Sequence, residues 1–83
     1  MAEFIQVGSG NLVSRKRLIS VVSADSAPVR RLVQEARDRS VLIDATSGKK
    51  SKSVLVMDSD HIVLSAMSVE EIQTGLTAVE DET

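Results

Sequence analysis

Residues 54–65 read VLVMDSDHIVLS, two apolar runs separated by a short polar turn. Runs rich in Val, Ile and Leu that are bounded by Asp and Ser are typical of strands. We therefore predict a strand over Val54–Met57, a turn over Asp58–Asp60 and a further strand over His61–Met67. A connection as short as this one joins two antiparallel neighbours.

Three more strands are predicted upstream of this stretch from the same kind of apolar, β-branched run. They are Phe4–Val7, Leu18–Val22 and Val41–Thr46. The residues Leu12–Val13 lead into the second of these strands. The turn residues Ser47 and Gly48 follow the last of these strands. We therefore expect a second hairpin, in which that strand pairs with Val54–Met57.

Two helices are also predicted. The first carries an apolar stripe at the helical spacing i, i+3, i+4, i+7, made of Val29, Leu32, Val33 and Ala36. Pro28 suits the first turn of this helix, and Ser26 or Asp25 is its candidate N-cap. Ser68 and Glu71 have the spacing of a capping box, which predicts a short second helix through Leu76.

The predicted order, β-β-α-β-β-β-α, indicates an α+β fold: a largely antiparallel sheet of about five strands, one main helix and a short C-terminal helix. Because 83 residues are too few for two separately packed domains, we expect one domain over residues 1–76. Residues 77–83 are expected to form an acidic, flexible tail. Phe4 is the only aromatic residue, and so thin a core favours a homo-oligomer.

The composition excludes several classes of protein. Without cysteine, the chain has no disulfide framework, no thiolate metal site and no cysteine nucleophile. No apolar run approaches the roughly 20 residues that cross a bilayer. The first residues also lack the basic and apolar regions of a signal peptide. We therefore expect a cytoplasmic protein that has no membrane partner.

The charge is distributed unevenly along the chain. All ten Lys and Arg residues lie between Arg15 and Lys52, a segment that holds four acids and so carries a net charge of +6. From Ser53 onward there are seven acids and neither Lys nor Arg. This asymmetry indicates a surface that binds polyanions beside an acidic C-terminal part.

Two clusters of basic residues are the candidate binding site. Arg15, Lys16 and Arg17 precede the second predicted strand, and Lys49, Lys50 and Lys52 follow the turn at Gly48. Cations on a rigid sheet can contact a phosphate backbone, although two solvated turns would show the same pattern. Since one aromatic residue cannot build a stacking platform for single strands, double-stranded DNA is the nucleic acid we expect.

The motifs for catalysis and metal binding are incomplete. Asp58, Asp60 and His61 could ligate a divalent metal ion. Aspartates in a turn more often bond to backbone amides, and no second histidine is present, so we expect no metal site. The glycines near Gly8 and Gly48 do not match a dinucleotide or phosphate-binding motif. Because the sequence shows no nucleophile beside a base, we predict that the chain is not an enzyme and uses no cofactor or small-molecule substrate.

The residues that the chain shares with one known family are spread over most of its length. They are Gly10, Asn11, Val13, Arg17, Ile19, Ser20, Val22, Ser23, and residues 25–28 (DSAP), 35–37 (EAR), 42–46 (LIDAT) and 57–66 (MDSDHIVLSA). In these residues the chain resembles the RemA family of bacterial extracellular-matrix regulators, from about Phe4 to Leu76. The resemblance implies a DNA-binding transcriptional regulator of biofilm-matrix genes, which forms closed rings with a basic rim.

The resemblance also implies roles for particular residues. The family's DNA-contacting arginine falls on Arg17, its arginine pair on Lys49 and Lys50, a nearby arginine on Lys52 and its functionally important proline on Pro28. Arg15 and Lys16 are additional to the family pattern, and Ser40 replaces a glycine that ends the helix. Lysine is a point charge whereas arginine reads guanine with a planar fork, so we expect DNA binding with less sequence selectivity.

These observations leave two principal hypotheses and a third. In the first, a ring-forming homo-oligomer associated with the nucleoid binds double-stranded DNA through Arg17, Lys49, Lys50 and Lys52, assisted by Arg15 and Lys16. In the second, an oligomeric adaptor or scaffold binds an acidic protein partner and no nucleic acid. In the third, Asp58, Asp60 and His61 serve a small metal-dependent enzyme.

Overall fold

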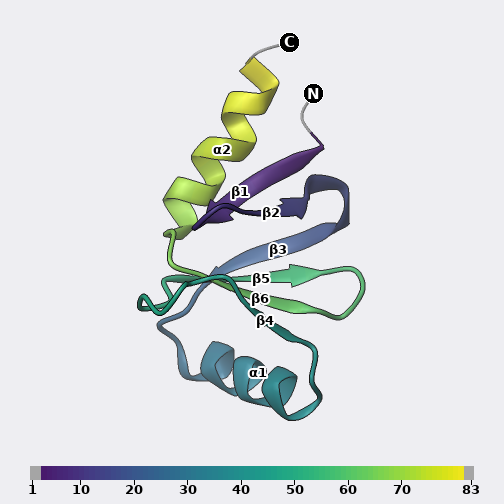
Figure 1. The fold of residues 1–83 in the computed structure, drawn as a ribbon, viewed down its shortest axis with the longest axis vertical. Coiled ribbons are helices and arrows are strands. Elements are labelled where there is room, and N and C mark those ends of the chain that lie inside the picture. The colour runs from purple at the N-terminus through teal and green to yellow at the C-terminus, as the bar shows by residue number, and fades with distance from the viewer. Residues whose placement is uncertain (1–2, 82–83) are drawn as a thin grey trace.

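The computed structural model describes residues 3–81 and shows an α+β fold, as predicted (Figure 1). Its elements are β1 (Phe4–Gly8), β2 (Asn11–Ser14), a 3₁₀ turn (Arg15–Arg17), β3 (Leu18–Ser23), α1 (Ala27–Asp38), β4 (Leu42–Asp44), β5 (Ser53–Met57), β6 (Ile62–Ser65) and α2 (Val69–Asp81). The strands form a two-stranded sheet, β1-β2, and a four-stranded sheet in the order β3-β5-β6-β4.

The hairpin predicted from residues 54–65 is confirmed. β5 and β6 are antiparallel, with Val54 opposite Leu64 and Val56 opposite Ile62. All four residues of β6 are buried. Because helices or strands cover the sheet on both faces, its central strands are continuously apolar instead of alternating.

The hairpin predicted around Ser47 and Gly48 is wrong. β4 does not pair with β5 but lies parallel to β6, with Leu42 opposite Ile62. The fully buried β6 takes a central position, whereas β4 has only three residues, two of them exposed, and takes an edge. A short, partly polar strand is well suited to an edge. The loop of residues 45–52 therefore passes from an edge strand across the end of the sheet to β5.

The N-terminal part also differs from the prediction. Residues 11–14 form a strand of their own, β2, which pairs with β1 and is separated from β3 by the 3₁₀ turn. The turn between β1 and β2 uses positive φ angles at Gly8 (101°), Ser9 (55°) and Gly10 (78°). Glycine reaches such angles at no steric cost, so the glycines at this position allow the tight reversal.

Two apolar clusters hold the layers together. On one face of the four-stranded sheet, Ile5 and Val7 of β1 pack with Leu55, Val63 and Ile72. On the other face, Ala36 of α1 packs with Val54, Ile62 and Leu64. Figure 1 shows the result, with α1 on one side of the sheet and α2 with the β1–β2 hairpin on the other.

Both helices begin at the predicted residues. The side chain of Ser26 accepts a hydrogen bond from the amide of Val29 (3.2 Å), and Pro28 lies in the first turn of α1. Ser68 and Glu71 form the reciprocal capping box, at 2.9 and 3.1 Å. α2 extends past Leu76 to Asp81, so most of the expected tail is helical; residues 82–83 lie outside the described part of the chain. Neither described helix combines the length and apolarity that crossing a membrane requires.

Candidate nucleic-acid interface

Arg17 lies beside the turn between β5 and β6. Its carbonyl oxygen accepts a hydrogen bond from the amide of Asp58 (2.8 Å), and its Nη1 lies 3.6 Å from Oδ1 of Asp58. The Arg17 side chain is 69% exposed and that of Asp58 is 45% exposed. Arg15 and Lys16 occupy the adjoining 3₁₀ turn and line a shallow hollow with Ile19. These cations therefore gather where β3 begins.

Lys49, Lys50 and Lys52 lie on the lysine loop, the connection of residues 45–52 between β4 and β5. The amide of Lys52 donates to the carbonyl of Ser65 (2.8 Å), and its own carbonyl accepts from Ala24 (3.1 Å). The loop is thereby held against both β6 and the end of β3. All three lysines are exposed.

The structure does not bring the two basic clusters together within one chain. Leu18 is opposite Met57 and Ser23 is opposite Ser53, so Arg17 and Lys52 flank opposite ends of β5. At about 3.4 Å per residue, the clusters are separated by roughly 20 Å along the strand direction. A single continuous basic surface would therefore need more than one subunit.

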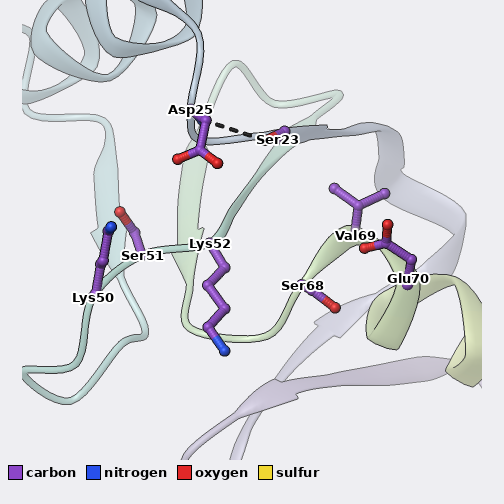
Figure 2. A pocket seen from close by; sticks show the side chains of 8 residues that line it. All are labelled: Ser23, Asp25, Lys50, Ser51, Lys52, Ser68, Val69 and Glu70. Carbon is purple, nitrogen blue, oxygen red and sulfur yellow. Dashed lines mark hydrogen bonds between the residues drawn. The ribbon is translucent and has the colours of Figure 1, made fainter.

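The lysine loop borders a hollow of about 440 Å³, which we call the loop hollow (Figure 2). Its lining consists of Ser23, Asp25, Lys50, Ser51, Lys52, Ser68, Val69 and Glu70. Figure 2 shows Lys52 between Lys50 on one side and the start of α2 on the other. Lys50 and Lys52 also line a second space, the hairpin hollow, together with Lys49, Glu71 and the β1–β2 turn. The lysines are thus shared by two adjoining depressions.

Carboxylates partly offset the charge of these lysines. Asp25 and Glu70 line the loop hollow, and Glu71 lines the hairpin hollow. Hydrogen bonds from the amide and hydroxyl of Ser68 lower the pKa of Glu71, and the positive charge of Lys52 lowers it further. Glu71 is therefore a carboxylate at neutral pH, close enough to Lys52 to weaken its attraction for a second anion.

Sequence reasoning missed two arginines that adjoin the lysine loop. Arg30 and Arg37 of α1 line a third space, the helix hollow, with Ala24, Val33, Gln34, Ser51 and Leu64. Ser51 also lines the loop hollow, so the two spaces meet at that residue. The spacing of seven residues, which places two side chains on one face of a helix, was the signal that could have found this pair.

The turn of Asp58, Asp60 and His61 makes contacts of a structural kind. Nδ1 of His61 lies 2.8 Å from the hydroxyl of Ser59, and Asp58 pairs with Arg17. Among the residues that the structure describes, no three His, Cys, Asp or Glu side chains are grouped so as to hold a metal ion. Nothing in this turn supports the metal-dependent hypothesis.

The fold and the basic surfaces define a class of protein: a small α+β domain that carries its cations on an exposed loop, a 3₁₀ turn and one flank of a helix. Comparison with known sequences gives the family. Residues 4–76 match the RemA-like family, described as extracellular matrix regulatory protein A-like. The chain belongs to this family, which confirms the resemblance noted in the sequence.

The relatives agree in length and in description. Extracellular matrix regulatory protein A of Bacillus subtilis is 49% identical over 79 residues, which cover 95% of this chain and 89% of that protein. A relative from Shouchella clausii is 51% identical over 79 residues, covering 95% and 91%. A third, from Brevibacillus brevis, is 48% identical over 80 residues, covering 96% and 93%. The latter two are described as candidate regulatory proteins. The family is thus one of bacterial regulators.

Proposed function

We propose that this protein is a transcriptional regulator that binds double-stranded DNA as a ring-shaped homo-oligomer in the cytoplasm, associated with the nucleoid. It is not an enzyme and needs neither cofactor nor small-molecule substrate. The observation that carries the proposal is the lysine loop, with three exposed cations. Main-chain hydrogen bonds of Lys52 to Ser65 and Ala24 tie the end of this loop to the sheet, and the amide of Lys49 bonds to the carbonyl of Thr46 within it. The name of the B. subtilis relative suggests extracellular-matrix genes as its targets.

The main-chain anchoring of Lys52, together with the bond from Lys49 to Thr46, favours contact with a duplex. Cations on a mobile segment lose conformational entropy when they bind, whereas a fixed backbone leaves only the side chains to be ordered. Phosphate contacts of this kind give sequence-independent affinity, and the logarithm of this affinity falls linearly with the logarithm of the salt concentration. The chain therefore binds DNA with a steep salt dependence and modest sequence preference.

The exposed edges of the four-stranded sheet favour assembly side by side. Ile19 on β3 is 65% exposed and Ile43 on β4 is 49% exposed, and these strands are the two edges of the sheet. An interface that joins one edge to the opposite edge of the next subunit is heterologous, and such interfaces form rings when the rotation from one subunit to the next closes on itself. In that arrangement the lysine loops repeat around one rim, and the Arg17 clusters repeat around the other.

Charge reversal of the lysine loop tests the proposal. We expect the double variant Lys49→Glu/Lys50→Glu to abolish retardation of duplex DNA in a gel-shift assay at low salt. Its mass by light scattering should equal that of the unaltered protein, because neither residue lies at a sheet edge. The matched control, Arg31→Glu/Arg39→Glu, reverses the same number of charges at the outer side and end of α1 and should retain binding.

Two results would overturn the proposal. Unchanged DNA binding by the lysine variant would remove the lysine loop from the interface. Absence of any gel shift by the unaltered protein, combined with capture of a partner protein that survives nuclease treatment, would favour the adaptor for an acidic protein instead.

A further inference from the structure

Of the three depressions that adjoin the lysine loop, the helix hollow is the one whose described lining residues include cations and no carboxylate. Among the described residues that line the three adjoining depressions, the loop hollow includes Asp25 and Glu70 and the hairpin hollow includes Glu71. The helix hollow, of about 260 Å³, is lined by two arginines and no carboxylate. A phosphate placed there meets no carboxylate among the lining residues that the structure describes, although Asp44 lies close enough to Arg37 for the arginine to lower the pKa of its carboxyl slightly.

We propose that Arg30 and Arg37 of α1 form a phosphate clamp that extends the DNA interface from the lysine loop onto the helix. The inference rests on the proposed DNA binding and adds to it a contact surface on an element that the basic clusters of the sequence do not include. The clamp and the lysine loop form one surface because Ser51 lines both hollows.

The chemistry of the two residues suits phosphate. A guanidinium group presents its N–H donors as a planar fork that can hold two phosphate oxygens at once, whereas a lysine ammonium acts as a point charge. The basic residues of the lysine loop are all lysines, so the arginines of α1 supply the directional contacts of this surface.

The spacing of the two residues also suits a nucleic-acid backbone. Seven residues of helix correspond to a rise of about 10.5 Å. Along one strand of B-DNA, successive phosphates advance by about 3.4 Å of helix axis. The two side chains are therefore far enough apart to reach separate phosphates of the same strand.

The three hollows define a direction for the duplex. Shared residues link them in a row: Ser51 joins the helix hollow to the loop hollow, and Lys50 and Lys52 join the loop hollow to the hairpin hollow. The row runs from α1 across the lysine loop to the β1–β2 turn, and its cations are Arg30, Arg37, Lys49, Lys50 and Lys52. DNA that follows this row meets the arginine clamp at one end.

The decisive variant is Arg30→Gln/Arg37→Gln in the full chain, with Arg31→Gln/Arg39→Gln as the matched control. Both remove two arginines from α1 or its C-cap, and glutamine preserves helix propensity. Each lost phosphate contact reduces the slope of log affinity against log salt by about 0.9. We expect the slope for the clamp variant to be shallower by about 1.8 or more and the affinity at 100 mM salt to fall at least tenfold. The control should lose less than threefold, with no change of slope.

A crosslinking experiment distinguishes direct contact of the helix hollow with DNA from a general effect of removing positive charge. The chain has no cysteine, so a single Gln34→Cys substitution allows a photoreactive label to be placed among the residues of the helix hollow. Duplex DNA should crosslink to this label. The same label at Glu35→Cys, about 100° further around the helix, should give little crosslinking.

The outcomes distinguish this inference from the proposed function. If the lysine variant loses DNA binding while the clamp variant behaves as its control does, the clamp is refuted and the lysine-loop interface stands. Equal crosslinking from positions 34 and 35 would also refute the clamp. If the unaltered protein fails to bind duplex DNA, both the proposed function and the clamp are refuted.

Discussion

Ser40 holds a backbone conformation that side chains disfavour. Its φ angle is 60°, and it lies just after α1, where the amides of Ser40 and Val41 bond to the carbonyls of Arg37 and Ala36. These two bonds form the Schellman motif, in which the left-handed residue is usually glycine. α1 therefore ends with the geometry expected for glycine, although this chain has serine in its place.

Replacing Ser40 by glycine should stabilise the protein. The left-handed conformation costs a non-glycine residue about 1–2 kcal/mol, and the greater freedom of glycine in the unfolded chain removes about 0.5–1 kcal/mol of the gain. For a domain of this size, we expect Ser40→Gly to raise the melting temperature by about 2–6 °C. Thermal unfolding followed by circular dichroism measures the change, and a lower melting temperature would contradict the strain argument.

Asp58 reduces the positive potential around Arg17, because its carboxylate lies 3.6 Å from the guanidinium. Asp58→Asn keeps a residue that suits the turn and removes one negative charge. Because the family resemblance gives Arg17 a DNA contact of its own, separate from the lysine loop, we expect the affinity for duplex DNA to rise about two- to threefold at low salt and the gain to vanish at high salt. Asp60→Asn, in the same turn, is the control and should give a smaller gain in the same titration.

Asp44 links the stability of the protein to pH. Hydrogen bonds from the hydroxyl and amide of Thr46, at 2.6 and 2.9 Å, lower the pKa of the Asp44 carboxyl, and Arg37 lowers it slightly further. A lowered pKa in the folded state stabilises the protein above the ordinary value of about 4, and this contribution is lost as the pH falls through the lowered pKa.

Asp44→Asn removes this titration. We expect the unaltered protein to exceed the variant in free energy of unfolding by a constant amount above about pH 5, with the difference shrinking below about pH 4. Urea titrations between pH 3 and pH 7 measure it. A difference that stays constant down to pH 3 would show that the Thr46 bonds do not depend on the charge.

At the level of elements, local contacts could be predicted from the sequence and distant ones could not. The cap of Ser26 on Val29 and the box of Ser68 with Glu71 each join residues three positions apart. The pairing of β4 with β6 instead of β5 depends on competition among apolar strands for the centre of the sheet, which no short motif encodes.

The candidate site shows the same contrast between residues that are close in sequence, which could be predicted, and residues that only the fold brings together. The lysine loop is contiguous in sequence and was found as a cluster of charge. Its neighbours Arg30 and Arg37 join it only through the packing of α1 beside Ser51. Arg17 was grouped with the lysines by resemblance, but antiparallel pairing of β3 with β5 places it at the other end of the sheet.

A buried serine fastens the β1–β2 hairpin to the four-stranded sheet. The hydroxyl of Ser65 donates to the carbonyl of Val7 (2.6 Å) and accepts from the amide of Met67 (3.0 Å). Ser65→Ala deprives both main-chain groups of a partner, which should lower the free energy of unfolding by about 1–3 kcal/mol. Urea unfolding measures this loss, and Ser20→Ala, at a partly exposed position of β3, should cost less. Equal losses would show that the bond does not hold the hairpin.

At the scale of the whole molecule, the proposed assembly depends on the two edges of the four-stranded sheet. The double variant Ile19→Ser/Ile43→Ser removes the exposed apolar side chains from both edges and leaves the core untouched. We expect its mass by light scattering to fall to that of a single chain, because the variant removes the apolar area that would be buried where two edges meet. Leu12→Ser, which alters a side chain that is 60% exposed on β2, should preserve the assembly. An undiminished mass for the double variant would place the interface elsewhere.

If the chain forms the proposed ring and binds DNA, the separation of the two basic clusters by the length of β5 makes the abundance of the protein a control of its activity. A single subunit presents one small cluster of cations to a duplex at each end of the sheet. One rim of the proposed ring presents many such clusters at a fixed spacing. Under that proposal, the occupancy of DNA rises steeply once the concentration passes the level at which subunits associate. A cell that adjusted the synthesis or breakdown of such a chain would gain a threshold switch that requires no signalling molecule.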